Sequence, residues 1–278
     1  MMNKPYISIV TAVKNAGLLL EQTILSIMNQ TFQDYEHVII DGVSDDDTLS
    51  VITKYREQYP MKFVSEPDRG ISDAFNKGVG LASGKWLLFL GAGDELVGPT
   101  VLSRLYQVLR EREGSLIVWG NVIFKDSSGK IGRWYNGDVS EFQFKRYMCL
   151  PHQAAFHNRL FFEKYGLFDP DLKRTMDYDL ILRALPEVQG GYYNYDVAYM
   201  LVGGQSQNVR AAMKEMLQVQ RKHRVFPAPV LYGLFYWAML KNSIKNIFGY
   251  STVGLGPIEE KTAGSQTDKP VYKMEEHK

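Results

Sequence analysis

The sequence predicts an α/β fold built on a doubly wound, mostly parallel sheet, and three observations lead to this prediction. Short apolar runs alternate with helical patterns through the first half of the chain, which is typical of strand–helix–strand units. The run Trp86–Leu90 is uniformly large and apolar, as expected for a strand buried on both faces. The chain has 278 residues, enough for one large domain with an appendage.

The first half contains four predicted strands separated by three predicted helices. The apolar residues of the helical segments recur at the spacing of one helix face. The second helix opens with three acids, which suit a helix N-terminus. In chain order, the predicted elements are strand 6–13, helix 18–28, strand 36–41, helix 45–59, strand 62–66, helix 71–83 and strand 85–90.

The second half is less regular. We expect two strands within Ser115–Tyr135 around a turn at Asp126–Gly129, a helix over Thr175–Leu185 and a strand over Gly190–Gly204. The end of the chain is polar and lacks periodicity, which predicts a disordered tail. The expected organisation is a domain over 1–205, with halves 1–97 and 98–205, then basic amphipathic helices over 206–250 and the tail over 251–278.

Composition narrows the class of protein. An apolar content of 45% and a charged content of 23% are ordinary for a soluble globular protein. The single cysteine, Cys149, rules out an intramolecular disulfide and a cysteine zinc cluster. The N-terminal residues lack the pattern of a secretory signal, and no apolar run approaches the roughly 20 residues of a membrane-spanning helix. We therefore expect a cytoplasmic protein.

Charge is distributed unevenly along the chain. Residues 1–209 carry 21 basic and 25 acidic side chains, whereas residues 210–245 carry seven Lys or Arg and one acid, Glu215. The basic stretch contains no recognisable nucleic-acid-binding module, so nucleic acid is not an expected partner.

A helix over Val230–Gly249 would align apolar residues on one broad face. Such a helix either closes the core or lies as a basic amphipathic helix on an anionic membrane, and both interpretations stay open. Its apolar segment is too short to span a bilayer. The residues of this face are Leu234, Trp237, Leu240, Ile244, Ile247 and Phe248.

Carboxylates follow the predicted strands, where parallel sheets bind their ligands. Asp41 ends one strand, Asp68 follows the next, Asp73 opens a helix, and Asp94 follows the buried strand. Turn-forming and helix-capping roles are a competing explanation for each acid. Four converging carboxylates would repel one another unless a cation or hydrogen-bond donors offset their charge. The sequence thus points to a divalent metal and a ligand with N–H groups.

Four segments resemble the family 2 glycosyltransferases in order and spacing. They are SIVTAVKN, IIDGVSDDDT, SEPDRGISDAFNKGVGLASGKWLLFLGAGD and DYDLILR, and the resemblance covers about residues 5–205. It implies the GT-A fold, an inverting reaction and a nucleotide-sugar donor, with UDP as the first expectation and GDP or dTDP as alternatives. The chain looks most similar to the bacterial branch that builds exopolysaccharide, capsule or O-antigen repeats.

The resemblance also implies partners and a location. The expected acceptor is a saccharide or a polyprenyl-linked saccharide, and the expected location is the inner face of the cell membrane, with peripheral attachment. Whether the chain forms a homodimer is left open.

Single residues inherit roles from the same resemblance. Asp94 matches the last acid of the family's Asp-x-Asp metal motif, which implies Mg²⁺ or Mn²⁺. Asp177 matches the general base, with Asp179 as the competing candidate and a helix N-terminal acid as the structural alternative. The residues implied for the nucleotide are Thr11, Ala12, Val13, Asp41 and Asp68, and those implied for the donor sugar are Asp73, Asn76, Gly93, His152 and Gln153.

The segment GAGD departs from the family pattern, because many relatives carry two or three acids after this strand. Gly91 and Gly93 take the place of acids there, and glycine lets a diphosphate approach the backbone closely. Magnesium needs only one or two protein carboxylates when phosphates and waters complete its octahedron. The expected metal site is therefore a weak, single-acid one. A non-catalytic subunit that binds a nucleotide sugar is the alternative reading.

Overall fold

The computed structural model describes residues 4–125, 131–134, 139–185, 188, 191–201 and 209–247. The predicted tail and the whole of the predicted turn at Asp126–Gly129 lie outside the described residues.

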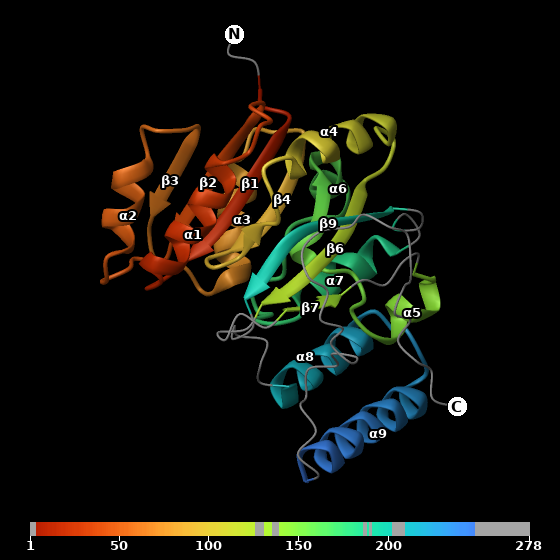
Figure 1. The fold of residues 1–278 in the computed structure, drawn as a ribbon. Helices are drawn as coiled ribbons and strands as arrows, with labels where there is room; N and C mark the ends of the chain where they lie inside the picture. The colour runs from red at the N-terminus through yellow and green to blue at the C-terminus, as the bar shows by residue number, and fades with distance from the viewer. Residues whose placement is uncertain are drawn as a thin grey trace.

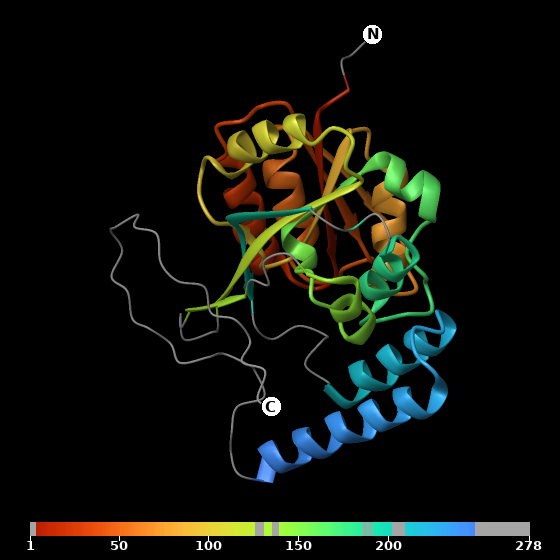
Figure 2. The same ribbon diagram turned by 90° about the vertical axis from the view of Figure 1, so that its right-hand side faces the viewer.

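A nine-stranded mixed sheet runs through the molecule, with helices on both of its faces (Figures 1 and 2). The strand order is β3-β2-β1-β4-β8-β6-β9-β5, and β7 pairs with β6. The strands are β1 (Ile7–Val13), β2 (Tyr35–Asp41), β3 (Met61–Ser65), β4 (Trp86–Gly91), β5 (Glu95–Leu96), β6 (Ile117–Lys125), β7 (Ile131–Trp134), β8 (Ala155–Asn158) and β9 (Tyr192–Leu201). The helices are α1 (Gly17–Met28), α2 (Thr48–Tyr55), α3 (Ile71–Leu81), α4 (Val101–Glu111), α5 (Glu141–Arg146), α6 (Arg159–Tyr165), α7 (Met176–Arg183), α8 (Val209–Lys222) and α9 (Ala228–Ile247), with a short 3₁₀ turn, η1 (His152–Ala154).

The first four strands are parallel and end level with one another. In the register of the sheet, Val13 pairs with Asp41, Asp41 with Ser65, and Ala12 with Gly91. This arrangement confirms the doubly wound half predicted from the alternating pattern. The carboxyl ends of β1 to β4 therefore form one edge, which is where an open α/β sheet binds ligands.

The second half of the chain makes the sheet mixed. β8 lies antiparallel to both β4 and β6, and β6 lies parallel to β9. The sequence analysis missed β8 and the helices α4 and α6. The strand β8 has only four residues and joins α6 directly, so it gave no separate signal of its own.

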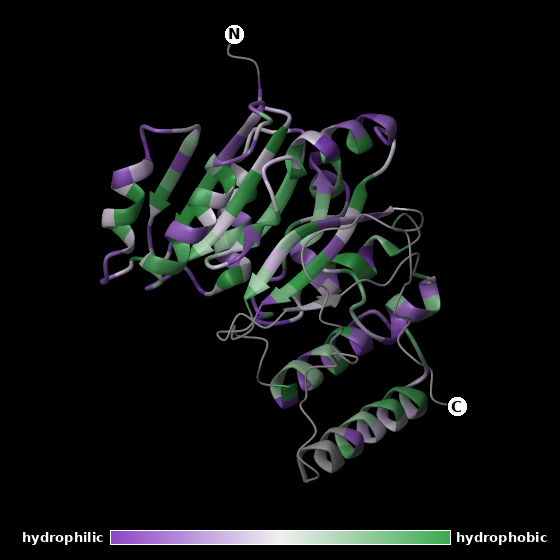
Figure 3. Ribbon diagram, viewed as in Figure 1, coloured by the Kyte–Doolittle hydropathy of each residue, from purple (hydrophilic) through white to green (hydrophobic). Residues whose placement is uncertain are grey.

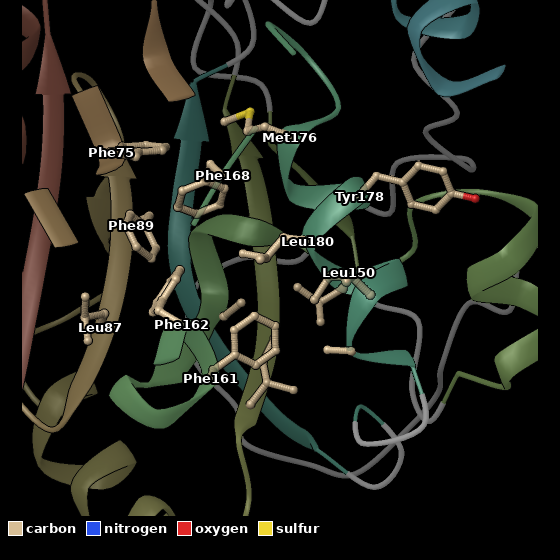
Figure 4. Close-up of a cluster of buried hydrophobic side chains, with 14 of the residues drawn as sticks. Phe75, Leu87, Phe89, Leu150, Phe161, Phe162, Phe168, Met176, Tyr178 and Leu180 are labelled. Carbon is tan, nitrogen blue, oxygen red and sulfur yellow. The ribbon is translucent and has the colours of Figure 1, made fainter. Parts of the chain in front are cut away.

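The strand β4 is buried on both faces, as its sequence predicts. Every residue from Trp86 to Leu90 is inaccessible to solvent. Phe89 points into an aromatic cluster beneath α3 and α6, where its ring centroid lies 5.0 Å from that of Phe75 and 5.2 Å from that of Phe168 (Figure 4). Leu88 and Leu90 pack on the opposite face, with α4. Burial on both faces rigidly fixes the strand that ends at Gly91.

The last two helices pack on each other at the edge of the molecule, away from the sheet (Figures 1 and 2). On α9, Leu231 is buried, whereas Tyr236 and Trp237 are 65% and 55% exposed. Apolar residues run along much of this helix (Figure 3). The side chains after Lys241, which include part of the predicted apolar face, lie outside the described residues.

In the part of the chain that the structure describes, no helix combines the length and apolar content needed to cross a bilayer.

Candidate functional site

The carboxyl edge of β1 to β4 holds the acids that follow these strands. Asp41 lies there with no solvent exposure. Its carboxylate accepts hydrogen bonds from the backbone N–H and the hydroxyl of Ser44 and from the hydroxyl of Ser65. These bonds fix the loop after β2, and the proposed contact of Asp41 with a nucleotide base stays a prediction.

Asp94 lies on the same edge, in the turn that follows β4. The N–H of Gly91 donates to its Oδ2 at 2.8 Å, and the N–H of Leu201 in β9 donates to its Oδ1 at 3.4 Å. The side chain is only 6% exposed, and this burial raises its pKa to about 7, although both N–H bonds act in the other direction. The two N–H bonds thus offset only part of the cost of burying the negative charge of Asp94.

The local structure explains why glycine stands at positions 91 and 93, just before Asp94. Gly93 has a φ of 97°, a conformation that residues with a side chain rarely adopt. Its N–H donates to the hydroxyl of Thr23 at 2.9 Å, and a Cβ there would lie 3.3 Å from Leu201. At Gly91, a Cβ would lie 3.1 Å from Oδ2 of Asp94. The turn holds the acid tightly and leaves little side-chain bulk around it.

The residues around Asp94 fit a divalent cation only if the cation brings most of its own ligands. Within the described ranges, no group of three or more His, Cys, Asp or Glu side chains could hold a metal ion. Each oxygen of Asp94 accepts one N–H and keeps a further lone pair for a cation. One carboxylate is enough for Mg²⁺ when phosphates and waters supply the other ligands.

The three residues implied for the nucleotide in β1 offer mainly their backbone. Thr11 is buried, and its hydroxyl lies 2.9 Å from Nε2 of His37. Burial lowers the pKa of His37 to about 3, so this pair is neutral. Val13 is also buried, and Ala12 is half-buried. The expectation that β1 contacts a nucleotide through its backbone is compatible with this packing.

The two acids around the start of α3 sit in different surroundings. Asp68 accepts the N–H of Gly70 at 2.8 Å and lies against Gly42, the residue after Asp41. Asp73 accepts from the backbone and the guanidinium of Arg69, and these bonds lower its pKa. Asp68 thus joins the edge that holds Asp41.

A loop that leads into α7 is tied to α3. The amide of Asn76 donates to the carbonyl of Phe168 at 2.8 Å and accepts the N–H of Phe168 at 2.9 Å. The hydroxyl of Ser72 donates to the carbonyl of Leu172. These bonds occupy the amide of Asn76, which the resemblance assigns to the donor sugar, and they hold the start of α7 beside the helix that begins at the sheet edge.

His152 lies within the aromatic cluster instead of projecting from a loop. Its ring stacks on Phe89 with a centroid distance of 5.2 Å and an interplanar angle of 13°. It is 8% exposed, and burial lowers its pKa to about 4, so the ring is neutral at pH 7. Its Nε2 has no hydrogen-bond partner among the residues that the structure describes. Gln153 is half-buried beside it, and the donor-sugar role of both residues stays a prediction.

The two acids at the start of α7, Asp177 and Asp179, differ sharply in burial and in pKa. Asp177 is partly exposed, and its pKa is raised to about 6, mainly by desolvation and further by the charge of Glu215. Asp179 is fully buried, with oxygens 3.0 Å from Arg183, 3.0 Å from Lys222 and 2.9 Å from His223. Burial alone would raise the pKa of Asp179, but the bonds from His223 and Lys222 and the charge of Arg183 lower it to about 2. Asp177 therefore has the environment of a proton acceptor, and Asp179 that of a structural ion pair.

Sequence analysis missed the partners that α8 supplies to this site. Glu215 accepts three backbone N–H groups ahead of α7, and Lys222 and His223 bind Asp179. The one available signal was that Glu215 is the lone acid of the basic stretch.

The chain matches a known family and named relatives. Residues 8–165 match the family model described as glycosyl transferase family 2. The PGL/p-HBAD biosynthesis glycosyltransferase of Mycobacterium bovis (strain BCG / Pasteur 1173P2) is 33% identical over 213 residues, which cover 75% of this chain and 82% of that protein. An uncharacterized glycosyltransferase of Methanocaldococcus jannaschii is 25% identical over 204 residues, covering 70% of this chain and 69% of that protein.

Solved structures share the fold. S. aureus TarS 1–349 in complex with UDP-GlcNAc has a TM-score of 0.65 at 15% identity, covering 90% of this chain and 74% of that one. The mannosyltransferase PcManGT from Pyrobaculum calidifontis, in complex with GDP-Man and Mn²⁺, has a TM-score of 0.61 at 17% identity, covering 91% and 77%. The GT-A fold expected from the sequence is confirmed.

The family match spans more than half of the chain and includes the whole parallel half of the sheet with Asp41 and Asp94. Both acids lie at the edge where these parallel strands end. The chain therefore belongs to glycosyl transferase family 2 and is a glycosyltransferase.

Proposed function

We propose that the protein is an inverting transferase that moves a sugar from a nucleoside diphosphate to a hydroxyl of a saccharide or lipid-linked saccharide. The anchoring of the α7 loop to α3 carries this proposal. Ser72 and Asn76 bind the backbone of Leu172 and Phe168, which holds Asp177 beside the helix that begins at the strand edge. Asp177 on the acceptor side and Asp94 on the donor side can then act on the same pair of donor and acceptor molecules.

Each acid has an environment suited to its proposed role. Asp177, with a pKa of about 6, is ionised at neutral pH and can take the proton from the acceptor hydroxyl as that oxygen attacks C1 of the sugar. Attack from the face opposite the diphosphate inverts the configuration at C1. Asp94 would hold a divalent cation, which, when bound, offsets the negative charge that develops on the departing diphosphate.

The nature of the donor is a proposal supported by the neighbours with the same fold. One of them binds UDP-GlcNAc, and another binds GDP-Man with Mn²⁺. We propose a UDP-sugar first, with Mg²⁺ or Mn²⁺, at the edge where β1 to β4 end. We also propose that the product belongs to cell-surface polysaccharide biosynthesis, of the exopolysaccharide, capsule or O-antigen kind.

A binding and turnover screen tests this function. UDP, GDP and dTDP are titrated against the protein by calorimetry with and without Mn²⁺, and release of the nucleoside diphosphate is followed with each nucleotide sugar and simple saccharide acceptors. One nucleotide should bind about tenfold more tightly with Mn²⁺, because the diphosphate supplies most of the metal ligands. Binding without turnover on any acceptor would favour a non-catalytic subunit. Failure to bind any nucleotide would overturn the proposal.

We further propose that α9 lies on an anionic membrane surface, so that the enzyme works at the inner face of the cell membrane. Its outward side carries apolar residues that are between 37% and 65% exposed, which is costly in water. Arg221 and Arg224, beside the turn between α8 and α9, line an open hollow of about 460 Å³ and suit lipid phosphates. The exposed apolar residues are Val230, Tyr232, Tyr236, Trp237 and Leu240.

The four basic residues Arg221–Arg224 fall into two pairs, one that binds Asp179 and one that lines the hollow. Lys222, whose side chain is 50% exposed, and His223 both pair with Asp179, so they serve the fold. Arg221 and Arg224 stay exposed on the side of the hollow. Membrane attraction therefore rests on fewer cations than the sequence suggests.

Changing exposed residues of α9 should release the protein from lipid without unfolding it. The double variant Trp237→Ser/Leu240→Ser is expected to bind vesicles containing phosphatidylglycerol at least about tenfold more weakly, because apolar burial drives interfacial binding. Co-sedimentation with vesicles measures this effect. Leu160→Ser is the matched control, because Leu160 on α6 is 55% exposed against 50% for Leu240. Equal binding by the wild type and the double variant would contradict the proposal.

A further inference from the structure

The helix α8 closes the N-terminal end of α7 with a single carboxylate. Oε1 of Glu215 accepts the backbone N–H groups of Lys173 at 3.1 Å, Arg174 at 2.7 Å and Thr175 at 2.7 Å. It also accepts the hydroxyl of Thr175 at 3.0 Å. Successive backbone N–H groups that converge in this way form an anion-binding concavity, and here the anion comes from another helix.

Within the described part of the chain, the N-cap side chain of α7 does not replace this interaction. Thr175 occupies the N-cap position of α7, but its side chain makes no capping bond to the helix. Its hydroxyl donates to Glu215 instead. Because the N-terminal N–H groups of a helix and of the turn before it need acceptors, the position of this segment depends on Glu215.

A second contact holds α7 to α8 on the other side of Asp177. Asp179 pairs with Lys222, the last residue of α8, with His223 in the turn that follows, and with Arg183 of its own helix. Asp177 lies two residues after Thr175 and two residues before Asp179, between the two attachments. Because the segment that ends at Thr175 and the side chain of Asp179 are both held by α8 and the turn after it, the carboxylate of Asp177 has little freedom to shift.

We infer that Glu215 is a positioning residue that holds Asp177 in place for proton transfer. This inference rests on the proposed role of Asp177 as the base. Glu215 acts through the backbone of Lys173 to Thr175 and touches no proposed substrate group. A displacement of about 1 Å at a reacting group can lower a rate by about 100-fold, so the loss of such a clamp should be visible in kcat.

The charges around Asp177 make a separate test possible. From α8 it faces Glu215, while Lys222 and His223 are engaged by Asp179, and Lys222 also by Asp169. From the preceding loop come Lys173 and Arg174, and from its own helix Asp179 and Arg183. Glu215 is the charged side chain whose field raises the pKa of Asp177. Glu215→Gln keeps an acceptor oxygen for the three N–H groups but removes this charge.

Two variants at position 215 separate positioning from charge. Glu215→Ala should lower kcat by about 10- to 100-fold with the KM for the donor nearly unchanged, because only the position of the base is disturbed. Glu215→Gln should keep kcat within about threefold at high pH and move the acid limb of the pH–rate profile to lower pH, since the like charge is gone. Glu163→Gln, the same change at an exposed position of α6, should alter neither quantity.

Amide hydrogen exchange provides a readout that does not depend on catalysis. Exchange at residues 173–175, measured by NMR or mass spectrometry, should accelerate in Glu215→Ala and stay slow in Glu215→Gln. If exchange accelerates while kcat and the acid limb stay as in the wild type, Glu215 is merely structural and the inference fails. If Glu215→Ala does not fold, Glu215→Asp takes its place, because its shorter side chain withdraws the carboxylate from the three N–H groups. Faster exchange at residues 173–175 with an unchanged kcat in that variant would overturn the inference. Full activity of an Asp177 variant would instead refute the proposed base.

Discussion

Replacing Asp177 with asparagine is expected to lower kcat by about 10²- to 10⁴-fold, the range associated with loss of a general base. Asparagine has nearly the same shape but cannot accept the hydroxyl proton. Affinity for the nucleotide should stay within about twofold, because Asp177 is not among the residues proposed to bind the nucleotide. Steady-state kinetics and calorimetric titration measure the two quantities.

The loss of rate should not be accompanied by loss of stability. The pKa of Asp177 is raised to about 6 in the folded protein, so its ionised form is disfavoured by folding at neutral pH. A neutral asparagine removes this cost, and the melting temperature should hold or rise.

The pH profile distinguishes Asp177 from Asp179. With Asp177 as the base, kcat of the wild type at saturating cation and donor, where the bound cation would keep Asp94 ionised, should rise with pH up to about 6 and then level off. A base with the pKa of Asp179 would place this limb near pH 2. The limb near pH 6 should vanish in Asp177→Asn. Persistence of both the limb and the rate in that variant would rule out Asp177.

Replacing Asp94 with asparagine should have opposite effects on activity and on stability. Transfer should fall by about 100-fold or more, because the variant loses the one protein carboxylate proposed to hold the cation. The free energy of unfolding at about pH 8 should rise by on the order of 1–3 kcal/mol, since a buried carboxylate with a pKa near 7 is replaced by a neutral amide. Urea unfolding in the presence of a chelator measures the second effect.

The size of the stabilising effect of Asp94→Asn depends on pH. Asp94 has a folded-state pKa of about 7, above its ordinary value of 3.8. Below that ordinary value the group is protonated in both states, and the folded state is not penalised. As the pH rises from about 4 to 7, only the unfolded chain ionises freely, so the wild type loses stability over this range and the variant does not. The gap between the two should therefore be largest above about pH 7.

Asp179 provides the contrast, because its pKa is lowered to about 2. Its stabilising contribution is present above the ordinary value of 3.8 and is lost as the pH falls through 2. Asp179→Asn should therefore destabilise the protein at neutral pH, opposite to Asp94→Asn.

Mn²⁺ with a nucleoside diphosphate should stabilise the wild type but not the Asp94→Asn variant. An Asp94→Asn protein that is less stable than the wild type at about pH 8 would contradict this account.

The sequence by itself determined the parallel half of the sheet and the place of its acids. Alternating apolar runs and amphipathic segments of ordinary length have few other solutions, because parallel strands need helical crossovers. The carboxyl ends of such strands must then share an edge. The sequence alone therefore places Asp41 and Asp94 at this edge and predicts the burial of Trp86–Leu90 on both faces.

Only the tertiary structure decided how the two acids of α7 differ and what surrounds Asp94. The sequence places Asp177 and Asp179 two residues apart with equal prospects of ionisation, but the fold buries one among cations from α8 and leaves the other against Glu215. It likewise brings the N–H of Leu201 to Asp94 across more than a hundred residues. Long-range contacts of this kind leave no periodic signal in the chain. The desolvation and the charge at a site depend on the residues that pack against it in space. Local sequence patterns encode the type of secondary structure and which of its faces is apolar, but they do not encode the distant residues that pack against it.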